Sequence, residues 1–363
     1  MSNKQPYYEY LIIGQGLAGS ILALHLIDMG KRVLVLDNAH ASSSSMVAAG
    51  MVNPIAGRRL AKSWKLDEAL PYARTFYKSC ECFTQTPCFF SRTIHRLLKN
   101  DEEVDKLQSR IHDPGYTPYL GQVHAALTLK YTQADTLGSV DILQGGYLAV
   151  SDFLVKARTR LEDQHAYQNT LFDYDLLKLC SNHIHYKNFT ARHIVFCEGW
   201  KGQDNPWFRW LPFNSAKGDI LTLQTPYKAI EKVFNQRKWI LPLENNQLKV
   251  GATYTRNVLN NTPEASAKIE LIEAFKSLLP DIHDYQVDNH QAGVRPLTID
   301  NHPFVGRHPE HPQLSIFNGF GSKGVLFIPL LANHFAQHLE QDTHIWNESN
   351  IQRFWQFSSS TCS

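Results

Sequence analysis

The chain has 363 residues, 43% of them hydrophobic, and its 36 Lys and Arg nearly balance its 34 Asp and Glu. At ~150 residues per domain, this length predicts two domains or one large folded unit that can enclose a cofactor. The balanced charge argues against a large nucleic-acid-binding face, although it leaves room for a local basic patch.

The cysteines predict neither a metal centre nor a disulfide framework. No two pairs among them have zinc-ligand spacing, so we expect no bound metal and reduced, cytoplasmic thiols. The N-terminus lacks the apolar stretch of a signal peptide, and the apolar segment 324–332 is too short to span a bilayer. We therefore expect a soluble protein. The cysteines are Cys80, Cys82, Cys88, Cys180, Cys197 and Cys362.

The first 37 residues have the pattern of a strand, a helix and a second strand. Residues 8–13 form a short apolar run, residues 17–29 have helical spacing, and residues 31–36 read as a buried parallel strand. The unit is about 30 residues long, as expected for a strand–helix–strand crossover.

A complete G-x-G-x-x-G joins the first strand to the helix at Gly14, Gly16 and Gly19, with Leu17–Ala18 between the last two. The first glycine suits a tight turn, the second a close approach of backbone to a pyrophosphate, and the third close helix packing. Asp37, at the end of the second strand, can accept hydrogen bonds from a ribose. The pattern predicts a dinucleotide site, the alternative being a glycine-rich turn in an unrelated α/β protein, and it does not separate NAD from FAD.

The later pattern alternates between helices and an antiparallel sheet. Helices are predicted at 66–82, 151–163, 263–279 and from about 324 to 339, whereas residues 213–262 contain alternating strand segments. Segments with the pattern of parallel α/β units thus alternate along the chain with segments typical of an antiparallel sheet. This order favours a nucleotide-binding domain that is interrupted by insertions.

Residues 293–306, GVRPLTIDNHPFVG, resemble the G-x-R-P-x-T-x-D-x-x-P-x-x-G signature of the D-amino-acid oxidase-like FAD-dependent oxidoreductases. This family includes glycine and sarcosine oxidases and the FAD domain of the bifunctional enzyme that matures 5-methylaminomethyl-2-thiouridine in tRNA. Further segments match in order, so the resemblance covers most of the chain. These segments are 45–51, 145–147, 217–219, 251–253 and 319–324.

The resemblance implies an α/β fold with a Rossmann-like FAD-binding domain and an inserted antiparallel-sheet (α+β) substrate domain. Residues 1–75, 151–212 and 291–363 would form the FAD-binding domain, and 76–150 and 213–290 the substrate domain. It also implies noncovalent FAD, because no Cys lies between Gly306 and Gly324, where monomeric sarcosine oxidases attach their flavin.

The resemblance places FAD contacts along both glycine turns and the segments between them. Phe172 would contribute through its backbone. The expected FAD-binding residues are Gly14, Gly16, Leu17, Ala18, Gly19, Asp37, Ser45, Met46, Ala49, Gly50, Met51, Phe172, Gly199, Trp200, Arg295, Gly319, Gly321, Ser322, Lys323, Gly324 and Val325.

Three residues are the candidates for catalytic roles. Arg295 would hold a substrate carboxylate, since its planar fork matches two oxygens, and the competing interpretation is an ion pair with Asp300 or another acid. Lys323 and the helix that follows would stabilise negative charge on the reduced flavin, or Lys323 is simply a surface residue. Tyr254 would wall the substrate pocket or fill the core of the sheet, whereas Trp239 suits the core better.

The implied activity is hydride transfer from the carbon beside an amine nitrogen of a small amine or amino acid to flavin N5. Glycine oxidases tend to carry a second Arg in the 319–324 turn, but this chain has Ser322-Lys323, closer to the tRNA-modifying domain. The alternatives are therefore oxidation of a carboxymethylaminomethyl-modified tRNA base, or a noncatalytic flavin-binding partner subunit. The pattern predicts no oligomeric state.

Overall fold

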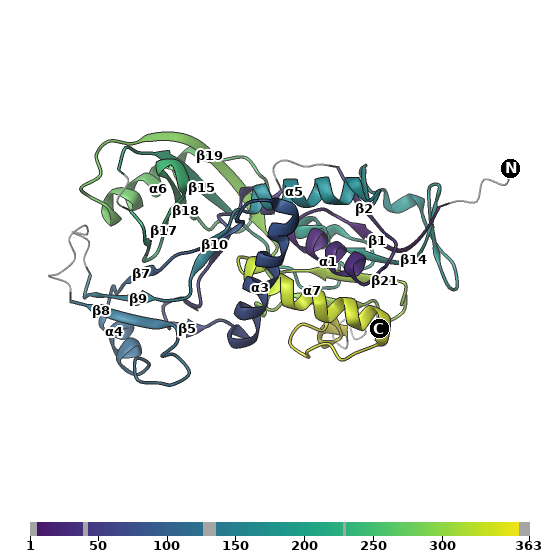
Figure 1. Ribbon diagram of the computed structural model, residues 1–363, viewed down its shortest axis with the longest axis horizontal. Coiled ribbons are helices and arrows are strands. Elements are labelled where there is room, and N and C mark those ends of the chain that lie inside the picture. Colours follow the sequence, from purple (N-terminus) through teal and green to yellow (C-terminus); the bar gives the residue numbers. More distant parts are fainter. Residues whose placement is uncertain (1–5, 39–42, 126–135, 228–229, 356–363) are drawn as a thin grey trace.

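Two eight-stranded sheets lie toward opposite ends of the long axis of the molecule (Figure 1). The computed structural model describes residues 6–38, 43–125, 136–227 and 230–355. The N-terminal strand lies in one sheet, and most of the middle of the chain forms the other.

The first sheet is built around parallel strands whose residues are buried on both faces. Its order is β11-β2-β1-β14-β13-β12, with β21 also beside β14 and β20 beside β21. The pairs Ile13–Phe196 and Phe196–Ile316 bring the ends of β1, β14 and β21 to one level. The strands are β1 (Tyr7–Ile13), β2 (Val33–Asp37), β11 (Tyr167–Asn169), β12 (Leu177–Leu179), β13 (Ile184–Tyr186), β14 (Phe189–Phe196), β20 (Phe304–Arg307) and β21 (Leu314–Asn318).

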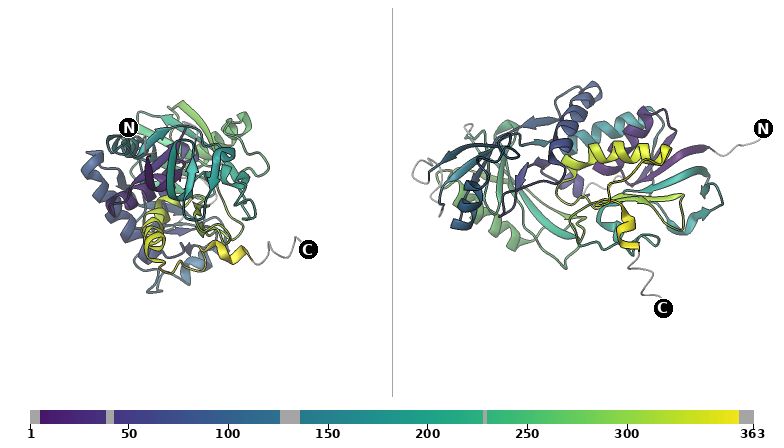
Figure 2. Two further views of the ribbon diagram at one scale, coloured as in Figure 1. Left: turned by 90° about the vertical axis from the view of Figure 1, so that its right-hand side faces the viewer. Right: turned by 90° about the horizontal axis from the view of Figure 1, so that it is seen from below.

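Helices cover one face of this sheet. The first helix, α1, buries nearly its whole length because it packs on the sheet and is itself covered by α7 and α5. Figure 2 shows α7, in yellow, lying alongside α1, in purple. Aromatic and aliphatic side chains from residues 172–213 cover the other face. The helices are α1 (Leu17–Asp28), α3 (Leu66–Thr84), α5 (Val150–Asp163) and α7 (Gly324–Gln341).

The second sheet has the order β19-β15-β18-β17-β16-β7-β9-β8 and is antiparallel except for the parallel pair of β16 with β7. Helix α6 (Ala265–Leu278) packs on one face through Leu271 and Phe275. The strands are β7 (Ile94–Leu97), β8 (Leu120–His124), β9 (Ser139–Ile142), β15 (Ala216–Gln224), β16 (Val233–Asn235), β17 (Trp239–Pro242), β18 (Gln247–Gly251) and β19 (Gln286–Arg295).

Two of the predicted domain boundaries fall inside helices or strands. Helix α3 runs across the domain boundary predicted at 75, and β19 runs across the one predicted at 290, so neither point is a break in structure. No described helix combines the length and apolar character needed to cross a bilayer. The remaining elements are α2 (Ser44–Val47), β3 (Met51–Val52), β4 (Ile55–Ala56), β5 (Ala61–Lys62), β6 (Phe89–Ser91), α4 (Asp101–Gln108), β10 (Gly146–Leu148), and 3₁₀ turns at Tyr174–Leu176, Gly199–Asp204, Glu244–Asn246 and Ile351–Phe354.

Candidate active site

Three glycine-containing turns meet at one edge of the parallel sheet. Gly14 follows β1, Gly199 lies just beyond β14, and Gly319 follows β21. Since neighbouring strands lie ~4.8 Å apart, the first and third turns are separated by roughly 10 Å across the sheet. Asn318 ties two of the turns together, because its amide nitrogen donates to the Gly199 carbonyl at 2.8 Å and its amide oxygen accepts the Gly319 N–H. Both glycine motifs therefore border the same edge.

In the first turn, Gly14 and Gly19 occupy positions that have no room for a side chain. Gly14 has φ +101°, and a Cβ at Gly19 would lie 1.9 Å from the Gly14 carbonyl oxygen. This is why α1 can begin directly against the end of β1. Gly16 precedes α1, and the Leu17 N–H donates to the Ser45 hydroxyl at 3.2 Å. The first N–H groups of a helix have no partner within the helix, so this end is suited to an anion.

Asp37 lies beside the first turn. Its carboxylate accepts the Gln15 N–H at 2.9 Å, and the Arg158 guanidinium lies 3.6 Å away. The Thr170 N–H donates to the Asp37 carbonyl at 3.0 Å, so the chain after β11 leaves the sheet next to this acid. Phe172 comes just after it and stacks on Tyr186 with ring centres 4.5 Å apart.

The segment expected to pass the cofactor contains a short helix rather than a continuous loop. Helix α2 is capped by Ser43 and packs against β19, where a Cβ on Gly293 would meet Val47 at 3.3 Å. The Ser44 hydroxyl donates to the Val294 carbonyl. Ser45, Met46 and Ala49 thus lie between the start of α1 and the end of β19. Gly50 has φ +71°, and Met51 then pairs with Tyr147 in β10.

Arg295 is partly buried at the end of β19 with its guanidinium over Gly218 of β15, where a Cβ would lie 2.1 Å from Nη2. Its guanidinium donates to the Thr253 carbonyl, which lies 3.4 Å from both terminal nitrogens. Burial lowers the pKa of Arg295, while Tyr254 and Asp219 partly offset the shift.

The competing expectation of an Arg295–Asp300 ion pair is wrong. Asp300 pairs instead with Arg353 at 2.7 Å. The Asp219 carboxylate is 2.9 Å from His290 Nε2 and accepts the Glu264 N–H. Within the described residues, Arg295 has no carboxylate within ion-pair distance.

The second glycine turn is joined to the Arg295 segment through the backbone. The Gly321 N–H donates to the Pro296 carbonyl at 3.1 Å, and Gly319 and Gly321 both have positive φ. Ser322 and Lys323 are exposed, Gly324 starts α7, and Val325 is buried. The Lys323 ammonium lies 6.0 Å from the centre of the Phe327 ring, and partial desolvation lowers the pKa of Lys323.

The remaining candidates lie in the second sheet, just beyond β18 and in the turn after β14. The Trp239 ring covers Gly251, where a Cβ would meet it at 2.4 Å, and it packs against the main core. Tyr254 is 53% exposed, with the Arg256 guanidinium 5.6 Å from its ring centre. Trp200 is partly buried in the turn that begins at Gly199.

Lys249 is a candidate that the sequence reasoning missed. It pairs with Leu241 in β17 and so shares a sheet face with Trp239, two residues before Leu241. Burial lowers the pKa of its ammonium, and the charge of Asp152 partly offsets this shift. The signal was present in the alternation of residues 247–251 (QLKVG), which places Leu248 and Val250 under α6 and the lysine on the other face.

Residues 9–338 match the model of a family described as DAO, FAD dependent oxidoreductase. The chain is 23% identical to a glycine oxidase of Bacillus licheniformis, with 91% of this chain and 92% of that protein covered. It is also 23% identical to the tRNA 5-methylaminomethyl-2-thiouridine biosynthesis bifunctional protein MnmC of Marinobacter nauticus, covering 94% of this chain and 57% of that longer protein. Its fold matches the crystal structure of glycine oxidase from Geobacillus kaustophilus with a TM-score of 0.81 at 20% identity, covering 94% and 96% of the two chains.

Proposed function

Because this chain belongs to the DAO family of FAD-dependent oxidoreductases, we propose that it oxidises the C–N bond of a small amine or amino acid bearing a carboxylate. FAD, when bound, supplies the acceptor for the hydride, at flavin N5. The protein has then to hold the cofactor, orient the substrate and keep water from the reacting carbon.

The glycine turns and helix ends are the residues proposed to hold FAD. Gly14, Gly16 and the start of α1 supply the close backbone approach and the helix N-terminal N–H groups that a pyrophosphate requires. Asp37 is proposed to bind the ribose. The turn at 319–324 and the start of α7 are proposed to border the flavin ring, where helix N–H groups and Lys323 would stabilise negative charge.

The observation that carries the substrate assignment is the partly buried, desolvated guanidinium of Arg295, which has no carboxylate partner among the described residues. A buried cation is costly without an anionic partner, so its environment favours a ligand that brings a carboxylate. The link from Pro296 to Gly321 supports a position beside the flavin turn. Tyr254 and Lys249 are proposed to border the same substrate space from the mixed sheet.

The test is an anaerobic screen in which D- and L-amino acids and carboxylate-free amines are mixed with the FAD-loaded protein. Substrates should bleach the flavin absorbance, and those with a carboxylate should do so fastest. The Arg295→Ala variant should keep its FAD but lose turnover of carboxylate substrates by roughly 100-fold or more, because a bidentate charge-assisted pair is lost. Arg209→Ala, which removes an exposed arginine, is the matched control. Full activity of Arg295→Ala on an amino acid would refute the assignment.

The likeness to the longer tRNA-modifying protein supports a second candidate, oxidation of a carboxymethylaminomethyl group on a tRNA base. In that case the protein should bind tRNA with an affinity that falls steeply with salt concentration. Bleaching by free amino acids without RNA favours the first function. If no amine or tRNA bleaches the flavin and a second protein copurifies stably, the chain is a partner subunit.

A further inference from the structure

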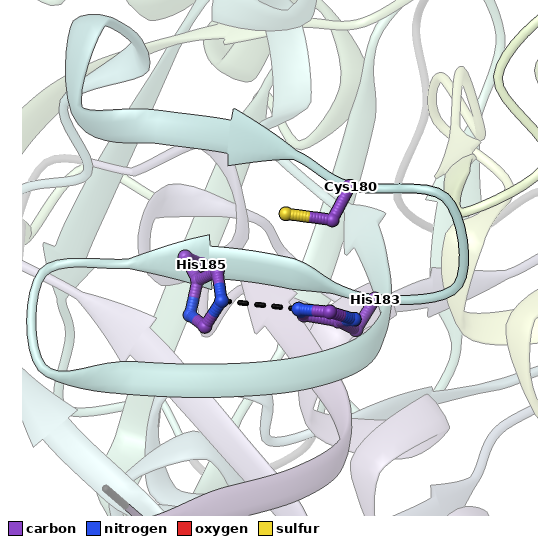
Figure 3. A group of neighbouring side chains, drawn as sticks. All are labelled: Cys180, His183 and His185. Carbon is purple, nitrogen blue, oxygen red and sulfur yellow. Dashed lines mark hydrogen bonds between the residues drawn. The ribbon is translucent and has the colours of Figure 1, made fainter.

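The hairpin of β12 and β13 carries three potential metal ligands that the oxidase site does not use. Cys180 follows β12, His183 immediately precedes β13, and His185 lies within β13. One ligand atom from each lies within 4.8 Å of the others. Figure 3 shows the Cys180 sulfur and the two imidazoles gathered on the hairpin, with the two rings directed toward each other.

The backbone explains why these side chains meet. The Cys180 N–H donates to the His183 carbonyl at 2.9 Å, so the two residues face each other across the tight turn at 181–182. His183 and His185 are two residues apart on one strand and therefore point to the same side. Ile184 and Tyr186 point to the other side and are buried. The Gln313 side chain donates to the Cys180 carbonyl at 2.7 Å and so fixes the end of the hairpin.

The histidine rings are already arranged as a pair of ligands. The two Nε2 atoms lie 3.0 Å apart and share a hydrogen bond, and this separation is close to the roughly 3.3 Å between two nitrogens each about 2.05 Å from a tetrahedral ion. His185 Nδ1 lies 3.1 Å from the Thr190 hydroxyl. When that oxygen accepts a hydrogen bond from Nδ1–H, the lone pair of Nε2 faces His183, which is the usual arrangement behind a metal-bound imidazole.

A second group, His95, His124 and Asp141, is less suited to a cation. The Lys232 ammonium lies 2.8 Å from the Asp141 carboxylate and already neutralises it. Both nitrogens of His95 are also within hydrogen-bond distance of neighbours, Asp141 at 2.9 Å and Ser139 at 3.0 Å. No such cation is paired with Cys180, His183 or His185 among the described residues.

We propose that Cys180, His183 and His185 form a Zn²⁺ site whose fourth position is filled by water. One thiolate and two imidazoles are ligands that Zn²⁺ favours, and the thiol proton passes to the buffer when the sulfur binds. All three side chains are partly exposed, so an ion has access from solvent.

The site takes no part in the oxidase chemistry, because it lies far from the edge where the glycine turns meet. His185 pairs with Thr190 near the start of β14, and Phe196 pairs with Ile13 at its end. The six steps along the strand from Thr190 to Phe196 span roughly 20 Å. The ion clips together the edge hairpin of the parallel sheet.

The test is a zinc titration of the full FAD-loaded chain, stripped with EDTA and dialysed, in competition with a chromophoric chelator. We expect one Zn²⁺ per chain. Cys180→Ser and His183→Ala should each weaken binding at least tenfold, and Thr190→Val, which keeps all ligands, by about tenfold. Cys82→Ser removes an exposed cysteine elsewhere and should change nothing. Co²⁺ should give a thiolate charge-transfer band that Cys180→Ser abolishes.

The flavin spectrum and Tm of each variant report whether it is folded. The proposal is overturned if no Zn²⁺ competes with the chelator, if Cys180→Ser and His183→Ala bind as the parent does, or if Cys82→Ser weakens binding equally. Should a ligand variant fail to fold, Thr190→Val decides, since undiminished zinc affinity there contradicts the proposed ligand geometry.

Discussion

Gly218→Ala should impair recognition of the substrate carboxylate without removing any charge. A Cβ at this position would lie 2.1 Å from Nη2 and 2.6 Å from Cζ of Arg295. The guanidinium would have to move by more than an ångström to restore ordinary contact, while the sheet backbone can accept alanine because Gly218 is not among the positive-φ residues. The added methyl group therefore displaces the guanidinium but does not remove it.

The expected loss of kcat/KM follows from the number of hydrogen bonds that the displaced guanidinium can still make to the substrate carboxylate. A hydrogen bond to a charged group contributes about 1.5–3 kcal/mol, so losing one of two should lower kcat/KM for a carboxylate substrate roughly 10- to 150-fold. Activity on an amine without a carboxylate should change much less. Steady-state kinetics on both substrate types, with flavin content and Tm measured in parallel, give the comparison.

Gly115→Ala is a suitable control, because its Cβ would meet only the Asp113 side chain, at 3.2 Å, in an exposed turn. The reasoning is refuted if Gly218→Ala keeps full kcat/KM on carboxylates that Arg295→Ala no longer turns over. An equal loss on both substrate types would also refute it, since that result indicates general damage to the site.

Three other perturbations test separate parts of the structure. Gly19→Ala places a Cβ 1.9 Å from the Gly14 carbonyl, so it should lower the stability by about 1–3 kcal/mol and release flavin. Tm and the absorbance of bound flavin measure the two effects. Unchanged values of both would contradict the packing argument. Lys323→Met should retain FAD but make its reduction potential more negative in an anaerobic dye titration, and an unchanged potential would leave the helix backbone as the stabilising group. Partial burial opposes ionisation of Glu340, yet hydrogen bonds, that from Lys31 first, lower its pKa to about 2. The unfolded carboxyl has a pKa of about 4.3, so this stabilisation is complete above about pH 5 and is lost toward pH 2. The free energy of unfolding of Glu340→Gln should therefore be lower than that of the parent at pH 7, and the difference should shrink as the pH falls from about 5 toward about 2. A difference that stays constant over this range would contradict the link between the Glu340 pKa and stability.

Local sequence patterns were sufficient to predict the strand–helix–strand unit that begins the nucleotide-binding part of the fold. The predicted strand at 8–13, helix at 17–29 and strand at 31–36 correspond to β1, α1 and β2 within a few residues. Hydrophobic periodicity, glycine spacing and the acid at position 37 are all set within one short stretch. Such features can be read without knowledge of the rest of the chain.

Features that depend on register between distant segments could not be read in this way. The contact of Arg295 with Gly218 follows from the pairing of β15 with β19, and the actual partner of Asp300 is Arg353, 53 residues further along. The Cys180 group could not be predicted from the spacing of cysteines, because its other two members are histidines. A tight hairpin had to be known before one cysteine and two histidines could be placed on one face.

The order in which the chain is synthesised also matters for this architecture. Helix α1 is made early, but it is covered by α7, and β14 receives β21 as its neighbour only after residue 314. Until those last elements leave the ribosome, the side of α1 that packs on α7 has no cover. The nascent chain should therefore need protection by a chaperone, and C-terminal truncations before residue 324 should aggregate rather than yield a smaller flavin-binding protein.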